Sequence, residues 1–306
     1  MSKPKIAISI GDLSGVGAEI ALKAHNAISA LCDPIYCINK DLFLQAAKLL
    51  ETTLPQGLNL CEVAGDFTIK KGVVNKESGR YSYDSFMAAI ELCETGKADA
   101  VVTLPIHKEA WMLAGLTFKG HTDLLRKHFN KEAIMMLGCP QMFVALFTEH
   151  IPLKEVASSL TYEKLRSFLL DLHRSIPKEK VAVLGLNPHA GDNGVLGNEE
   201  EIIIKVIEDL NKEIGFEQFV GPIVPDVAFA PYFRKNFHYY VAMYHDQGLA
   251  PLKALYFDES VNISLNLPII RTSVDHGTAF DIAYKNRAET LSYINAIQSA
   301  IELRNS

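Results

Sequence analysis

Short apolar runs recur along the sequence, and polar turn residues follow each run at once. A strand that is apolar throughout must be buried on both faces, which is typical of parallel sheets covered by helices. Segments with apolar residues at helical spacing separate these runs. The alternation predicts an α/β fold with a mostly parallel sheet. Strands are expected at residues 5–10, 34–38, 98–106, 142–147, 181–186 and 239–244, and helices at 41–50, 83–95 and 156–170.

A further helix is expected to run through Leu210. Asn198 and Glu201 have the spacing of a capping box at its start, and Gly215 is placed to end it. The chain has 306 residues, enough for two domains, and contains no internal repeat. Turn residues and composition change near two positions. We therefore expect one domain of residues 1–117 plus 248–306 and a second domain of residues 118–247.

Charge and cysteine content exclude several classes of protein. The net charge of -6 gives no overall attraction to nucleic acid or to an anionic membrane surface. No window approaches the ~20 apolar residues that span a bilayer. The five cysteines are scattered, odd in number and without a CxxC pair, which argues against a disulfide framework. We expect a cytoplasmic protein with no nucleic-acid or membrane partner.

Histidines follow three of the expected strands. His150, His189 and His245 each lie shortly after an apolar run. In open α/β sheets, ligands bind outside the carboxyl ends of the strands. Three neutral imidazoles suit a divalent metal, although a histidine taken alone at such a position is more often a hydrogen-bonded loop residue than a ligand. Asp246, beside His245, is a candidate metal ligand, orienting partner or proton acceptor.

Basic and polar residues stand in otherwise apolar surroundings. Lys253 and Arg271 are flanked by apolar residues, and Asn262 lies midway between them. Such residues suit the binding of a carboxylate or phosphate, and Arg can bind bidentately. At residues 118–123, Thr122 has the position of an N-cap, and His121 beside it would assist an anion at the helix start. The residues leave both interpretations open.

A glycine-rich turn follows the first expected strand. Gly11, Gly15 and Gly17 invite a nucleotide-binding interpretation, but Ile20 stands where GxGxxG requires its third glycine. A tight strand-to-helix turn explains the glycines equally well.

Taken together, the motifs resemble one family, the 4-hydroxythreonine-4-phosphate dehydrogenases of vitamin B6 biosynthesis. Residues 11–20 (GDLSGVGAEI) resemble the family's GDPAGIGPEI, 120–123 (GHTD) its GHTE, 187–191 (NPHAG) its NPHAGE, and 243–249 and 271–281 match two further blocks in family order. Some positions depart from the pattern: Leu13 and Ala18 replace prolines, and Asp123 replaces a glutamate. Tyr-Lys-Asn at 284–286 replaces a glycine-rich turn.

The resemblance implies two α/β/α domains similar to those of isocitrate and isopropylmalate dehydrogenases, with an active-site cleft between them. It implies a homodimer whose site draws residues from both subunits. The implied reaction is NAD(P)-dependent oxidation of 4-phosphooxy-L-threonine at C3, followed by decarboxylation to 3-amino-2-oxopropyl phosphate in pyridoxal 5′-phosphate biosynthesis. The alternative is a metal-dependent dehydrogenase of the same family that acts on another phosphorylated hydroxy acid, such as a sugar-acid phosphate.

The resemblance also implies roles for individual residues. One divalent metal (zinc, magnesium or cobalt) is assigned to His150, His189 and His245. Substrate contacts are assigned to His121, Thr122, Lys253, Asn262 and Arg271. Contacts to NAD or NADP are assigned to Gly11, Asp12, His276, Gly277, Thr278 and Asp281. Asp246 and Lys253 are the expected catalytic groups.

Overall fold

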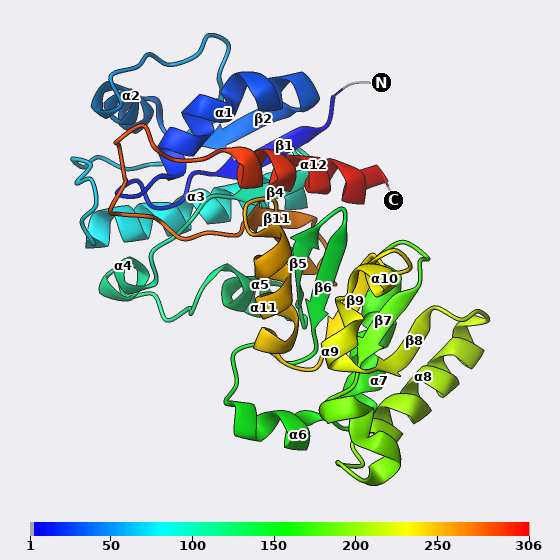
Figure 1. Cartoon of the computed structure of the whole chain (residues 1–306). Coiled ribbons are helices and arrows are strands. Elements are labelled where there is room, and N and C mark those ends of the chain that lie inside the picture. The colour runs from blue at the N-terminus through cyan, green and yellow to red at the C-terminus, as the bar shows by residue number, and fades with distance from the viewer. Residues whose placement is uncertain (1–2, 306) are drawn as a thin grey trace. The chain divides into compact units, whose positions relative to one another are not determined.

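A computed structural model describes residues 3–305, which divide into two compact units (Figure 1). We call the residues up to Lys131 together with those from Val261 onward the N/C unit, and Glu132–Ser260 the central unit. The boundaries expected after residues 117 and 247 lie earlier in the chain than these limits. The reason is that the two helices beginning at His121 and His245 each pack within the unit that precedes them.

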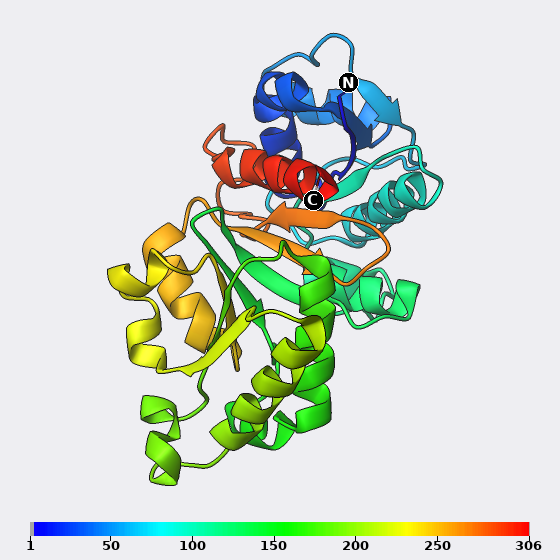
Figure 2. The same cartoon turned by 90° about the vertical axis from the view of Figure 1, so that its right-hand side faces the viewer.

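The N/C unit is a mostly parallel sheet between helices. Its strands are β1 (Lys5–Ser9), β2 (Asp33–Cys37), β3 (Asn59–Cys61), β4 (Ala100–Thr103), β10 (Val261–Leu265) and β11 (Arg271–Val274), in the order β3-β2-β1-β4-β11-β10. Its helices are α1 (Gly17–Leu31), α2 (Lys40–Leu49), α3 (Lys76–Glu94), α4 (Lys108–Leu113), α5 (His121–Phe129) and α12 (Leu291–Asn305). Only β10 is antiparallel to its neighbour, β11. Figure 2 shows α1 and α12 on one side of these strands and α3 on the other.

The central unit repeats this construction on a smaller scale. Its strands are β5 (Ile134–Cys139), β6 (Met142–Leu146), β7 (Val181–Leu184), β8 (Phe219–Ile223) and β9 (Tyr239–Ala242), in the order β5-β6-β9-β7-β8. Its helices are η1 (Leu153–Glu155), α6 (Val156–Ser159), α7 (Tyr162–Ser175), η2 (Pro188–Gly194), α8 (Glu200–Ile214), α9 (Pro225–Ala228), α10 (Pro231–Arg234) and α11 (His245–Tyr256). β5 and β6 form an antiparallel pair, and the remaining neighbours are parallel. The predicted α/β class with a mostly parallel sheet is therefore confirmed.

One core layer of the central unit lies beneath α11. Successive side chains of a strand point to opposite faces of the sheet. Val144 of β6 and Ala242 of β9 lie on the same face, and this face packs against Leu249 and Leu252 of α11. Gly248 lies where the helix approaches this face most closely. A Cβ atom there would stand 2.4 Å from a Val144 methyl group. The glycine of the HDQG motif is thus required by packing.

Several local predictions need correction. The expected helix at 156–170 is two helices, because the chain breaks at Leu160 and Thr161 caps α7 with its side chain. The capping box at Asn198 and Glu201 is wrong, since α8 begins at Glu200 without a side-chain cap. Gly215 does end α8 in the left-handed conformation, as predicted. Within residues 3–305, no helix has the length and apolar content needed to cross a membrane.

Candidate active site

Arg271 is the most unusual charged residue of the N/C unit. It begins β11 and is only 2% exposed, yet no carboxylate among residues 3–305 pairs with it. Its guanidinium donates to neutral oxygens instead, those of Thr103 (2.7 Å) and Ser264 (3.1 Å), with Asn262 at 3.5 Å. Its Nε atom is buried and has no partner among the described residues. Burial lowers the pKa of Arg271 to about 9, so its environment lacks the anion that would compensate its charge.

His121 lies close enough to Arg271 to respond to its charge. Its ring packs edge-on against Phe86, with centroids 4.8 Å apart, and against Trp111 at 5.9 Å. The His121 Nε2 atom is buried without a hydrogen-bond partner in the described part of the chain. Burial, and then the Arg271 charge, hold the pKa of His121 well below its usual range. A neutral imidazole and an uncompensated guanidinium together suit an anionic group with oxygen acceptors.

The predicted N-cap role of Thr122 is wrong. α5 begins at His121, so Thr122 lies inside the first turn, and the N-cap position belongs to Gly120, without a side-chain cap bond. The Asp123 carboxylate accepts from the Lys119 backbone N–H at 2.9 Å and fixes the approach to the helix. Thr122 is half-buried beside His121 and stays a predicted substrate contact.

Sequence reasoning missed Thr103 and Ser264 as partners of Arg271. Thr103 ends β4, and Ser264 lies directly opposite Arg271 in the β10–β11 register. A small hydroxyl residue in each of two buried strands was the available signal, but only the strand order reveals that both face one guanidinium.

The three histidines of the central unit follow strands that are neighbours in its sheet. β6, β9 and β7 are adjacent and parallel, so His150, His245 and His189 emerge at the same edge. The rings of His150 and His245 lie 5.4 Å apart, at 47° to each other. His245 Nδ1 stands 2.6 Å from the Asp246 carboxylate, an arrangement in which Nδ1–H donates and Nε2 keeps its lone pair.

The structure brings two of the three predicted metal ligands together, and the metal itself stays a prediction. Two imidazoles with centroids this close fit two ligand positions of a divalent ion. His189 lies in η2, is exposed and has a positive φ of 52°, and no ring contact joins it to the pair. Over residues 3–305, no group of three His, Cys, Asp or Glu side chains is placed to hold a metal ion.

A buried carboxylate holds the turn that carries His189. Glu200 is 4% exposed, and its side chain accepts from the backbone N–H groups of Leu186 (2.8 Å) and Asn187 (2.7 Å). It also accepts from the Asn187 side chain at 2.9 Å. Sequence reasoning selected the neighbouring Glu201, because a capping box gives a local signal and a bond back to the preceding strand end gives none.

The two expected catalytic groups lie on α11. The Asp246 side chain is 85% exposed and contacts His245, so it is placed to orient that imidazole. Lys253 is half-buried in the last turn, with its ammonium 5.3 Å from the centre of the Phe257 ring. Gln247 accepts from the Met243 backbone N–H, which fixes the strand end just before His245.

The six expected cofactor residues fall into two groups. Gly11, Asp12 and Thr278 hold the β1–α1 turn: a Cβ at Gly11 would stand 2.3 Å from the Pro105 oxygen, and the Thr278 carbonyl accepts from Val16 N–H. Asp12 is fully buried, and burial raises the pKa of its carboxyl despite bonds from Ser14 and Ser78. The remaining three, His276, Gly277 and Asp281, are exposed.

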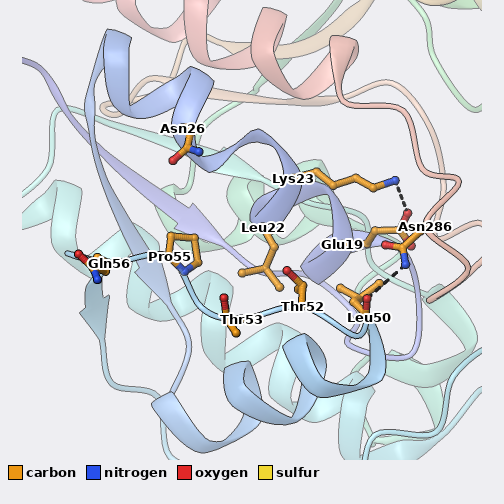
Figure 3. Close-up of a pocket in the computed structure, with 10 residues that line it drawn as sticks. All are labelled: Glu19, Leu22, Lys23, Asn26, Leu50, Thr52, Thr53, Pro55, Gln56 and Asn286. Carbon is orange, nitrogen blue, oxygen red and sulfur yellow. Dashed lines mark hydrogen bonds and ion pairs between the residues drawn. The ribbon is translucent and has the colours of Figure 1, made fainter.

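A cavity of about 510 Å³ lies elsewhere in the N/C unit, between α1, the segment after α2 and Asn286 (Figure 3). The Glu19 and Lys23 side chains line it and pair at 2.8 Å. None of the expected site residues lines this cavity.

Comparison with known proteins identifies the family. Residues 30–300 match the family model described as pyridoxal phosphate biosynthetic protein PdxA. The chain is 70% identical over 303 residues to a 4-hydroxythreonine-4-phosphate dehydrogenase of Sulfurimonas denitrificans, and 54% identical over 304 residues to one of Campylobacter fetus, each covering 99% of both chains.

Solved structures agree with these relatives. A crystal structure of 4-hydroxythreonine-4-phosphate dehydrogenase from Klebsiella pneumoniae is similar with a TM-score of 0.86 and 31% identity, covering 99% of this chain and 100% of that one. One from Burkholderia phymatum has a TM-score of 0.83 and 32% identity, with 99% of each chain covered. The resemblance found in the motifs is thereby confirmed, and the chain belongs to the PdxA family of pyridoxal phosphate biosynthetic proteins, a family of dehydrogenases.

Proposed function

We propose that this chain oxidises 4-phosphooxy-L-threonine at C3, with NAD or NADP as hydride acceptor, and then releases CO2 to give 3-amino-2-oxopropyl phosphate. The relatives' name supports the substrate and the reaction class. The structural observation that carries the proposal is the buried guanidinium of Arg271, which no carboxylate neutralises among the described residues. A phosphorylated amino acid supplies the missing anion.

Arg271 binds an anionic end of the substrate in this proposal. Thr103 and Ser264 each take one guanidinium N–H, which holds the planar group in place. The Nε–H has no partner among the described residues and leaves a further donor for the ligand. Neutral His121 accepts or donates a single hydrogen bond without adding charge, and Asn262 and Thr122 complete the polar contacts. Lys253 is the predicted second cation, for whichever of phosphate and carboxylate Arg271 does not bind.

His150 and His245 hold the divalent metal in this proposal, and His189 is the third ligand. A bound ion supplies electrostatic stabilisation for the oxyanion that develops at the C3 oxygen. Asp246 accepts a hydrogen bond from His245 Nδ1, which would leave the Nε2 lone pair available to a bound ion. The C3 hydroxyl loses its proton and C3 its hydride, which leaves a β-keto acid that loses CO2. Asp246 and Lys253 remain the predicted groups for the proton transfers.

We propose that the third ligand comes from a second copy of the chain. The support is that His150 and His245 lie together, while His189 stands on an exposed turn and forms no metal-holding group with them among the described residues. Mixing His189→Ala with His245→Ala tests this. In a mixed dimer, one site receives its ligands from the two intact halves, and equal mixing restores about a quarter of wild-type activity. No recovery after verified subunit exchange would contradict the shared site.

A coupled set of assays tests the reaction itself. With 4-phosphooxy-L-threonine, metal and coenzyme, we expect reduced coenzyme and CO2 in equal amounts. The same amino acid without its phosphate is the matched control, and we expect kcat/KM to fall about 10- to 150-fold, because a charge-assisted contact contributes about 1.5–3 kcal/mol. Equal turnover of both compounds, or coenzyme reduction without CO2, would refute the proposal. Running NAD and NADP in parallel identifies the coenzyme.

A further inference from the structure

Cys37 and Cys61 end neighbouring strands and lie directly opposite each other. β2 and β3 are parallel, with Cys37 in register with Cys61, and β3 is the edge strand of the N/C unit. Neighbouring strands are about 4.8 Å apart, and disulfides join Cα atoms roughly 4.4–6.8 Å apart. Register partners also present their side chains on the same face. The backbone therefore brings the two sulfurs together.

The two thiols are chemically different. The Cys37 thiol is buried and lies opposite the half-buried Cys61, where it is placed to donate a hydrogen bond to the Cys61 sulfur. This bond lowers the pKa of Cys61 to about 7, aided by Lys97 and opposed by burial, Glu91 and Glu62. The same bond and burial raise the pKa of Cys37 well above its usual range.

The three other cysteines provide an internal reference. Burial raises the pKa of Cys32 and of Cys93 to about 12, and it also raises the pKa of Cys139. Thiolate, and not thiol, is the nucleophile. Of the five cysteines, Cys61 alone combines partial exposure with a stabilised thiolate and an adjacent second thiol.

We propose that Cys61 and Cys37 form a redox-active thiol pair that a hydroperoxide oxidises to a disulfide. The Cys61 thiolate attacks one peroxide oxygen, the O–O bond breaks, and hydroxide leaves as Cys61 becomes a sulfenic acid. The Cys37 thiol then displaces water from that sulfur and forms the S–S bond. Each hydrogen peroxide thus converts two thiols to one disulfide and two waters. A dithiol reductant reverses the change.

The disulfide would tie the edge strand β3 to β2. Asn39, which follows β2 in the chain, already holds the segment after β3. Its side chain donates to the carbonyls of Val63 (3.0 Å) and Gly65 (2.8 Å). After oxidation, the disulfide would hold Cys61 to β2, while the Asn39 hydrogen bonds hold the segment at Val63 and Gly65. The pair contains none of the residues assigned to the reaction, so the proposal is independent of that function.

Alkylation kinetics of the folded, reduced chain test the first half of the proposal. Iodoacetamide labelling, quantified for each cysteine by peptide mass spectrometry, should give Cys61 a midpoint near pH 7. Cys37→Ala removes the S–H donor, and the midpoint should rise toward about 8.5. At pH 7 labelling should slow only about threefold, because the less acidic thiol is the better nucleophile. Cys37→Ser keeps a donor and should keep the low midpoint.

Peroxide treatment followed by non-reducing peptide mapping tests the second half. We expect a linked peptide containing Cys37 and Cys61 in the wild-type chain and in Cys93→Ser, and none in Cys37→Ser, where Cys61 stops at the sulfenic acid. A wild-type midpoint at or above 8.5, a link that contains Cys93, or oxidation of Cys61 without a link would each overturn the proposal. The wild-type measurements need no variant, so they test the proposal even if Cys37→Ala fails to fold.

Discussion

The candidate functional residues of the N/C unit and those of the central unit differ in how firmly contacts within the chain fix their side chains. Arg271 of the N/C unit is 2% exposed and bonded to oxygens from neighbouring strands. In the central unit, the side chains of His150 and His245 are 66% and 38% exposed and follow strand ends, with His245 as the first residue of α11. A residue within a strand inherits its position from the sheet. A residue after a strand needs further partners, such as a metal ion or a second subunit, to fix it.

The largest expected effect comes from Arg271→Met, which should separate function from stability. Removing two charge-assisted contacts of about 1.5–2 kcal/mol each lowers kcat/KM by ~100- to 1,000-fold. Because the charge is buried without a counter-ion, the free energy of unfolding should stay the same or rise. Steady-state kinetics and urea unfolding measure both. Arg166→Met, which removes an exposed partner of Glu213, is the control and should leave kcat/KM unchanged. A large loss of stability in Arg271→Met would mean that the arginine is structural.

Metal binding is expected to depend on the exposed residues His150 and His245. His150→Ala or His245→Ala should weaken Zn²⁺ binding on the order of 100-fold or more, since each removes a ligand. Competition titration against a chromophoric chelator measures the affinity. His128→Ala removes a histidine that pairs with Glu94 in the N/C unit and should bind Zn²⁺ as the wild type does. Unchanged affinity in both ligand variants would remove the basis for a metal at this edge of the sheet.

Glu200→Gln tests how firmly the turn that carries His189 is held in the central unit. The change weakens the acceptors of two backbone N–H groups, and the free energy of unfolding should fall by about 1.5–3 kcal/mol. Glu201→Gln, on the exposed adjacent position, should change it by less than ~0.5 kcal/mol. Chemical denaturation of both variants gives the answer. A larger loss of unfolding free energy in Glu201→Gln than in Glu200→Gln would instead favour the capping box at Asn198.

The smallest effect concerns pH. The folded pKa of His121 lies well below that of the unfolded chain, so between the two values the unfolded state binds more protons. Stability from this residue is therefore present above about pH 6.5 and is lost as pH falls, by at most about 1.4 kcal/mol per pH unit. Urea unfolding of His121→Asn at pH 7.5, 6.5 and 5.5 should show a shallower decline than the wild type. His25, whose pKa burial also lowers, is present in both proteins and cancels in the difference.

Strand and turn positions were predictable because they depend on residues close in the chain. The apolar runs located β1, β4, β6, β7 and β9, and the histidines after three of them identified one sheet edge. Arg271 was recognisable as a candidate binding residue because a charged residue in apolar surroundings implies a partner. Thr122 and Glu201 were misassigned as capping residues, because a capping motif depends only on residues close in the chain. Capping motifs are local, and here the N-cap positions went to Gly120 and Glu199.

By itself, the sequence determined the α/β class, the family, the strand ends that carry histidines and the presence of a buried arginine. Each of these depends on residue type and on spacing along the chain. The tertiary structure alone decided that Thr103 and Ser264 meet Arg271, that Glu200 holds the His189 turn, and that Cys37 faces Cys61. Such contacts join residues distant in sequence, and strand order and register, set by the packing of the whole sheet, determine which of them meet.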